Sequence, residues 1–277
     1  MKKVQADKRK LISSKDLRGA APMRSRYLDL DDRTQDLAER IRDYPDIATD
    51  FLQKYDLSWI YHENALEGVV YTLQELTAAL DAPPVADALV VGALQEVRNH
   101  KAAINAIRAE AQAKKPKLTV TLVKRLHETL NAGIQSRGPS EYRKDMPLHR
   151  AYFHEIAEPT KIQALLAKLL DSTDTADFRQ SHPLHQASRI QHGFMQVFPY
   201  TEGSGKVARL LSNLLLLHKG YLPCIVHSVD RQRYYESLRL PETALRDLML
   251  EAMENGLGNA EKFFSEAVAV RAKRASR

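Results

Sequence analysis

The sequence predicts an all-α, mainly helical fold with a small β-hairpin flap. Apolar residues make up 44% of the 277 residues and recur at helical spacing through most of the chain, which is enough to bury a substantial core. The exception is residues 142–159, where Tyr152 and Phe153 stand among polar residues before Pro159. This stretch lacks a helical pattern and suits an extended ribbon.

Turn residues and apolar spacing define the helices of the first half. The first helix follows Asp32 and carries Leu37 and Ile41, and the second opens at Pro45 and runs toward Trp59. Asp and Pro favour the start of a helix. Three further helices are expected over residues 73–80, 86–113 and 119–132.

The second half is expected to be helical wherever the same spacing recurs. The segments are residues 161–170, 183–197, 206–219, 230–240, 241–254 and 259–273.

The positive charge lies mainly at the N-terminal end. Residues 1–26 hold nine Lys and Arg against two Asp, so a net charge of +6 leaves the rest of the chain at −1. We therefore predict a basic tail without fixed structure over residues 1–28. A charge confined to solvated ends argues against a nucleic-acid partner.

The composition favours a cytoplasmic protein. No apolar run reaches the eighteen residues typical of a membrane span, and the first residues are charged. Cys224 is the single cysteine, so no internal disulfide can form. A lone cysteine fits a reducing compartment.

Residues 202–209, Glu-Gly-Ser-Gly-Lys-Val-Ala-Arg, carry the clearest chemical signal. Gly203 and Gly205 let backbone N–H groups approach a ligand, and the helix that follows adds a partial positive charge. Lys206 and Arg209 project from its first turn on one side. The segment predicts a phosphate pocket, with Ser204 at its centre and Glu202 as a candidate Mg²⁺ ligand.

A Walker A loop is the rival interpretation, because Gly205-Lys206 is part of that motif. It fails because Tyr200 stands where the first glycine should be. Val207 also stands where Ser or Thr should hold the metal.

Residues 198–209 instead resemble the Fic family signature, His-Pro-Phe-x-(Asp/Glu)-Gly-Asn-Gly-Arg-x-x-Arg. The chain reads Phe-Pro-Tyr-Thr-Glu-Gly-Ser-Gly-Lys-Val-Ala-Arg there. The departures are Phe198 for the histidine, Tyr200 for phenylalanine, Ser204 for asparagine and Lys206 for arginine.

Residues 61–68, Tyr-His-Glu-Asn-Ala-Leu-Glu-Gly, resemble the Ser/Thr-x-x-x-Glu-(Gly/Asn) motif of Fic proteins that carry an inhibitory helix on the N-terminal side. Glu67 and Gly68 match, and Glu63 stands where Ser or Thr is usual. The resemblance spans about residues 45–240. It implies a Fic-like domain over residues 29–277, made of an inhibitory helix (about 45–68), a Fic core (about 86–240) and C-terminal helices (241–277).

The resemblance also implies a function. In the family the motif histidine takes a proton from the target hydroxyl as that oxygen attacks the α-phosphate of ATP, and the inhibitory Glu pairs with the last motif Arg, here Glu67 and Arg209. Phe198 cannot act as that base. His192 and Tyr200 are the nearest replacements, and packing explains both better.

We therefore expect a catalytically degenerate Fic protein that binds ATP or another nucleotide with Mg²⁺ and acts through protein contacts. Its flap, with Tyr152 and Phe153, would either hold a target segment by strand addition or simply pack as a hairpin. Two alternatives stay open, namely a transferase with an altered donor or acceptor and a scaffold that binds no nucleotide. The oligomeric state is left open too.

Overall fold

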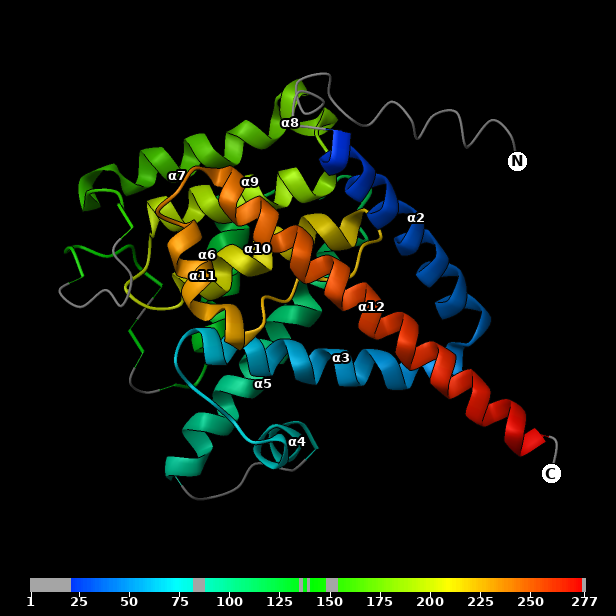
Figure 1. The fold of residues 1–277 in the computed structure, drawn as a ribbon. Helices are drawn as coiled ribbons and strands as arrows, with labels where there is room; N and C mark the ends of the chain where they lie inside the picture. Colours follow the sequence, from blue (N-terminus) through cyan, green and yellow to red (C-terminus); the bar gives the residue numbers. More distant parts are fainter. Residues whose placement is uncertain (1–20, 82–87, 135–136, 139, 148–153, 276–277) are drawn as a thin grey trace.

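The computed structural model describes residues 21–81, 88–134, 137–138, 140–147 and 154–275, and this part of the chain is mainly helical (Figure 1). Its α-helices are α2 (Ala21–Asp43), α3 (Pro45–Leu66), α4 (Leu73–Asp81), α5 (Ala88–Ala111), α6 (Val120–Asn131), α7 (Ile162–Asp171), α8 (Ala176–Gln180), α9 (Pro183–Val197), α10 (Ser204–His218), α11 (Arg231–Ser237) and α12 (Glu242–Ala275). Its 3₁₀ turns are η2 (Pro159–Lys161), η3 (Ser172–Asp174) and η4 (Ser228–Asp230). None of these helices is both long enough and apolar enough to cross a membrane.

Helices α9 and α10 form the centre of the fold. Twelve of the fifteen residues of α10 are buried, so this helix has almost no face toward solvent. Helices α5 and α6 pack against α10, and α7 and α12 pack against α9. Figure 1 shows α3 running past this centre, with its C-terminal end close to α11. The loop of residues 198–203 joins the two central helices and is therefore held on both sides.

Helix α12 is continuous, whereas the sequence analysis predicted a break between residues 254 and 259. Two glycines in that interval look like helix breakers, but the helix continues through both. A Cβ at Gly256 would lie 3.4 Å from the Tyr55 hydroxyl, and one at Gly258 would lie 3.6 Å from Arg33 Nη2, which are ordinary packing distances. Glycine lowers helix stability by about 1 kcal/mol, and the packing of α12 against α2, α3 and α9 offsets this cost.

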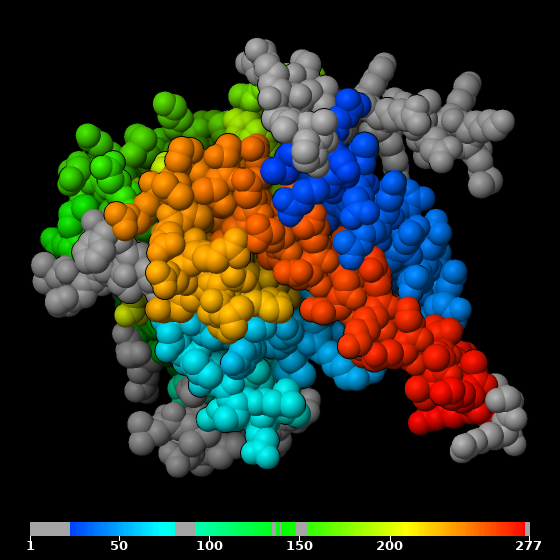
Figure 2. Space-filling model, viewed as in Figure 1, coloured from blue at the N-terminus to red at the C-terminus, as the bar shows by residue number. Residues whose placement is uncertain are grey.

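Helix α2 begins at Ala21, so the predicted boundary of the basic tail at residue 28 is wrong. Arg26 forms a two-pronged ion pair with Glu254, at 2.8 and 2.6 Å, and is not a freely solvated charge. Tyr27 and Leu30 are buried. Figure 2 shows the result, in which α12 lies in a band across α2 and α3. Residues 1–20 lie outside the described part of the chain.

The predicted β-hairpin is not found among the described residues, which contain no strand. The backbones of its two described arms bond to the loop after α9 and to α9 itself, and the Arg143 side chain of one arm donates to Ala157 O of the other. Arg143 N–H donates to Pro199 O at 2.9 Å, and Ala157 N–H donates to Gln196 O at 2.8 Å. Tyr152 and Phe153 lie outside the described residues.

The start of α2 can be tested with two neighbouring substitutions. Tyr27 is 5% exposed and stacks on His182 with ring centroids 4.6 Å apart, whereas Leu28 is 46% exposed. We expect Tyr27→Ala to lower the free energy of unfolding by about 2–4 kcal/mol and Leu28→Ala by about 0.5 kcal/mol or less, as measured by urea denaturation. Equal small effects would show that residues 21–28 are not part of the folded domain.

Candidate functional site

The loop between α9 and α10 begins and ends at residues with a left-handed backbone conformation. Helix α9 ends at Phe198, whose φ of 45° lies in the left-handed region, and α10 begins after Gly203, with φ of 77°. A left-handed residue with a side chain costs about 1–2 kcal/mol. Strained residues of this kind are concentrated at functional sites, where the surrounding structure holds them.

Ser204 lies inside the loop rather than facing a ligand. Its hydroxyl accepts from Tyr200 N–H at 2.9 Å and donates to Tyr200 O at 2.8 Å. The side chain is fully buried. Ser204 can therefore offer a ligand its backbone N–H but not its hydroxyl, unlike the longer asparagine in the Fic signature.

His127 of α6 holds the same loop from the other side. Its ring stacks on Tyr200 with centroids 3.6 Å apart. Because a carbonyl can only accept, Nε2 carries the proton and donates to Glu202 O at 3.0 Å, and Nδ1 accepts from the Ser140 hydroxyl at 2.7 Å. Burial lowers the pKa of His127 and raises that of Tyr200. Both side chains are thus neutral supports, and Tyr200 is no base near neutrality.

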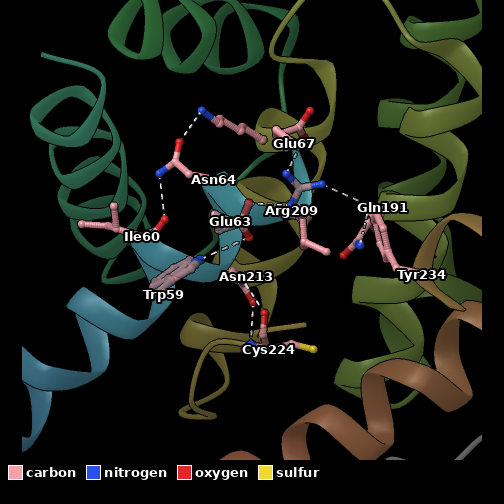
Figure 3. Close-up of polar contacts among 12 residues, drawn as sticks. Trp59, Ile60, Glu63, Asn64, Glu67, Gln191, Arg209, Asn213, Cys224 and Tyr234 are labelled. Carbon is pink, nitrogen blue, oxygen red and sulfur yellow. Dashed lines mark hydrogen bonds and ion pairs between the residues drawn. The ribbon is translucent and has the colours of Figure 1, made fainter. Parts of the chain in front are cut away.

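Arg209 is held by two carboxylates of α3 (Figure 3). Its Nε donates to Glu63 Oε2 at 2.5 Å, and its Nη2 donates to Glu67 Oε1 at 2.6 Å. The side chains of Arg209 and Glu63 are each 3% exposed, whereas that of Glu67 is 32% exposed. Burial opposes the charge of Arg209, but its anionic neighbours, Glu63 first, outweigh burial and raise its pKa.

Glu67 reaches into residues 202–206, which we call the glycine loop. A Cβ at Gly205 would lie 2.5 Å from Glu67 Oε1, so a larger residue there would push this carboxylate out of its observed position. Gly68, with φ of 93°, ends α3 directly after it, as is common for glycine at a helix end. Burial opposes the charge of Glu67, but Arg209 and then Lys206 outweigh it and lower its pKa.

Lys206 is the second cation of the loop, and a residue of α3 accepts a hydrogen bond from it too. Its Nζ donates to Asn64 Oδ1 at 2.8 Å. Burial lowers its pKa in spite of the attraction of Glu67. Deeper in the fold, His100 of α5 is fully buried, and neither of its ring nitrogens has a hydrogen-bond partner among the described residues. Burial first, and then the charges of Lys206 and Arg209, lower its pKa, so it is neutral.

Glu202, the candidate Mg²⁺ ligand, is engaged by an arginine. Arg137 Nη1 lies 2.6 Å from Glu202 Oε2, and Arg137 Nη2 donates to Glu96 Oε1 at 3.0 Å. Within the described ranges no group of three or more His, Cys, Asp or Glu could hold a metal ion. The residues present therefore offer a divalent ion one carboxylate that a guanidinium already binds, which does not fit a preformed Mg²⁺ site.

Phe198 is half-buried, and its ring contacts that of His154. The two rings meet edge to face with centroids 6.2 Å apart, and His154 Nε2 donates to Met195 O at 2.9 Å. His192, the other candidate base, donates from Nε2 to Leu240 O at 3.0 Å and is buried. His192 is thus a packing residue, in agreement with the sequence analysis.

The glycine loop and the helices around it match the model of the Fic/DOC family over residues 117–216. This segment of the chain is therefore a match to the Fic family. Among curated Fic proteins the chain is similar to the protein adenylyltransferases Fic of Drosophila willistoni and Drosophila virilis, with 24% identity over 181 residues in each. These matches cover 65% of this chain and 36% and 37% of the relatives, so the chain spans about a third of their length.

Solved structures of Fic proteins share the fold. The C. elegans protein Fic-1 (residues 134–508) superposes with a TM-score of 0.73 and 18% identity, over 88% of this chain and 72% of the other. A Fic-domain-containing signaling protein from Bacteroides thetaiotaomicron gives a TM-score of 0.69 and 19% identity, over 83% and 97%. The Fic fold therefore extends well beyond the matched segment.

The structure brings the two sequence motifs together, and it adds residues that the motifs did not indicate. Glu67 lies against Gly205 and pairs with Arg209. The additions that contact residues 198–209 are Glu63, Asn64, His127, Arg137 and His154. Glu63 and Asn64 lie within residues 61–68, but of the two only Glu63 stands at a position that the motif specifies.

Removal of Arg209 tests whether the buried pair is a structural element. Arg209→Met leaves Glu63 as an unpaired buried charge, so we expect a loss of about 3 kcal/mol or more in the free energy of unfolding. Adding Glu63→Gln should recover part of that loss. As a control, Arg233→Met removes the exposed pairs with Asp230 and Glu251 and should cost about 1 kcal/mol or less. Equal losses for the two arginine variants, measured by urea denaturation, would contradict a buried charged pair.

Proposed function

We propose that this chain is a Fic-family protein that binds a phosphate-bearing ligand, such as ATP, on its glycine loop and performs AMP transfer poorly or not at all. The observation that carries the proposal is the position of Glu67. Its carboxylate already lies over Gly205 and pairs with Arg209, so the loop holds an anion supplied by the chain itself. Backbone N–H groups at a helix start beside fixed cations are a common phosphate site.

The loss of transfer is proposed from Phe198. A phenyl ring has no lone pair to take the proton from an attacking hydroxyl, and losing a general base typically costs about 10²–10⁴ in rate. Neither Tyr200 nor His192 compensates, because both are buried and engaged elsewhere. Lys206 further weakens the phosphate grip, because an ammonium lacks the two-pronged geometry of a guanidinium.

We also propose that α3 keeps the site closed, and more firmly than one glutamate would. Glu63 stands where the resemblance leads one to expect Ser or Thr, and it adds a second carboxylate to Arg209. When Glu67 moves aside, Arg209 is still paired. A phosphate must therefore compete with a buried partner as well as with an exposed one, which makes the closed state part of the resting structure.

A transferase with altered chemistry is the second candidate, and His154 is the observation that favours it. Its imidazole is buried and donates from Nε2 to Met195 O, as that of His192 does to Leu240 O, but it packs beside Phe198, so a base here would act through Nδ1. The similar Drosophila proteins are named protein adenylyltransferases, so the partner we propose for this chain is likewise a protein. The cytoplasmic location that we propose for this chain rests on its single cysteine.

Ligand binding tests the closed pocket. We expect wild type to bind ATP with Mg²⁺ weakly in isothermal titration, and Glu67→Gly to bind it more tightly. Glu63→Gln/Glu67→Gly should gain about a further tenfold, because the glutamine keeps a hydrogen bond to Arg209 but removes the competing charge. Glu155→Gly, at an exposed loop residue, should match wild type. No binding by any of these proteins would favour a scaffold.

Label transfer separates the two candidates. The double variant is incubated with cell lysate, Mg²⁺ and ATP labelled at the α-phosphate, and we expect no labelled protein. Adding Phe198→His should raise the label by about 10² or more, because it restores the missing base. Label that appears with Phe198 in place, and disappears with His154→Ala, would instead establish a transferase that uses the flap histidine.

A further inference from the structure

Arg137 occupies a built position beside the glycine loop. Its guanidinium bridges two carboxylates, with Glu202 at 2.6 Å and Glu96 at 3.0 Å. Glu96 is itself fixed, because the Tyr71 hydroxyl donates to its other oxygen at 3.2 Å. The Arg137 side chain is largely buried. These contacts orient the guanidinium toward Glu202.

The positive charge of Arg137 acts on the same part of the site as the charges of Lys206 and Arg209. It contributes to lowering the pKa of both Lys206 and His127, although burial is the larger cause in each case. Arg137 thus approaches residues 202–206 from the segment after α6, and Lys206 and Arg209 approach them from the first two turns of α10. The acids that balance them include Glu67, the carboxylate that a ligand would displace.

From these contacts we propose that Arg137 takes the place of a divalent cation beside Glu202, so that the loop binds a diphosphate-bearing ligand without a metal. The inference rests on the proposed function, because it concerns the same pocket.

The donor chemistry supports this substitution. A Mg²⁺ ion in a nucleotide site uses one or two carboxylates and the ligand phosphates as a bridge. Here the bridge from Glu202 to a phosphate is a guanidinium, which has five N–H donors and matches both carboxylate and phosphate oxygens. An incoming Mg²⁺ would have to displace Arg137 from Glu202 and remain next to its positive charge.

Titration with ADP in the presence and absence of metal tests the proposal. The full chain carrying Glu67→Gly is used, since this change opens the loop and keeps the buried pair of Arg209 with Glu63. We expect the affinity in EDTA to lie within about threefold of that in Mg²⁺. Adding Arg137→Gln should weaken binding in EDTA by about tenfold or more, the loss expected for a charged hydrogen bond to phosphate, and Mg²⁺ should then partly restore it.

Two matched variants complete the experiment. Arg125→Gln removes an exposed arginine that pairs with Glu110, and it should leave ADP affinity unchanged in both buffers. Glu202→Gln frees Arg137 from its competing carboxylate, so binding in EDTA should stay equal or strengthen; circular dichroism confirms folding of each variant. A tenfold loss of ADP affinity in EDTA with Arg137 intact, or no effect of Arg137→Gln, overturns the proposal while the pocket stands. No ADP binding in either buffer overturns the pocket as well.

Discussion

A buried arginine must have an anion beside it, and this requirement determines how α3 meets α10. Moving a guanidinium out of water costs several kcal/mol unless it is paired. Glu63 and Glu67 are four residues apart at the end of α3 and therefore lie on one face, where both reach Arg209. The absence of a side chain at Gly205 gives the second carboxylate its space. Helix α3 is thus held in place by the residues that it covers.

The shape of the loop does not depend on the residue at the position of the missing histidine. Ser204 bonds to the backbone of Tyr200, His127 supports Glu202 O, and Arg143 donates to Phe198 O at 2.8 Å. None of these contacts uses the side chain of residue 198. The proposed anion pocket and the general base of the family would therefore rest on different groups, so that one can be absent without the other.

The sequence was sufficient for features that depend on neighbouring residues. The spacing of apolar side chains predicted α9 over residues 183–197, as observed, and the two motifs indicated the pairing of Glu67 with Arg209. It failed where distant segments meet. Arg137 reaches Glu202 across 65 residues of chain, and no local pattern carries that information. The glycines of α12 misled for the same reason, since the packing of this helix against α2, α3 and α9 keeps it continuous through them.

The two glutamates on Arg209 have different roles because their burial differs. Glu63 is sealed in the core, so its charge keeps Arg209 in place whether or not a ligand is present. Glu67 lies at the edge and can leave for water at little cost in solvation, although its lowered pKa shows that it gives up favourable pairing when it does. On the function proposed above, binding would be an exchange of one anion for another. A single carboxylate or chloride would gain little by that exchange, whereas a diphosphate would bring more charge and more acceptors to Lys206, Arg209 and Arg137. We therefore expect the closed pocket to select highly charged phosphate ligands.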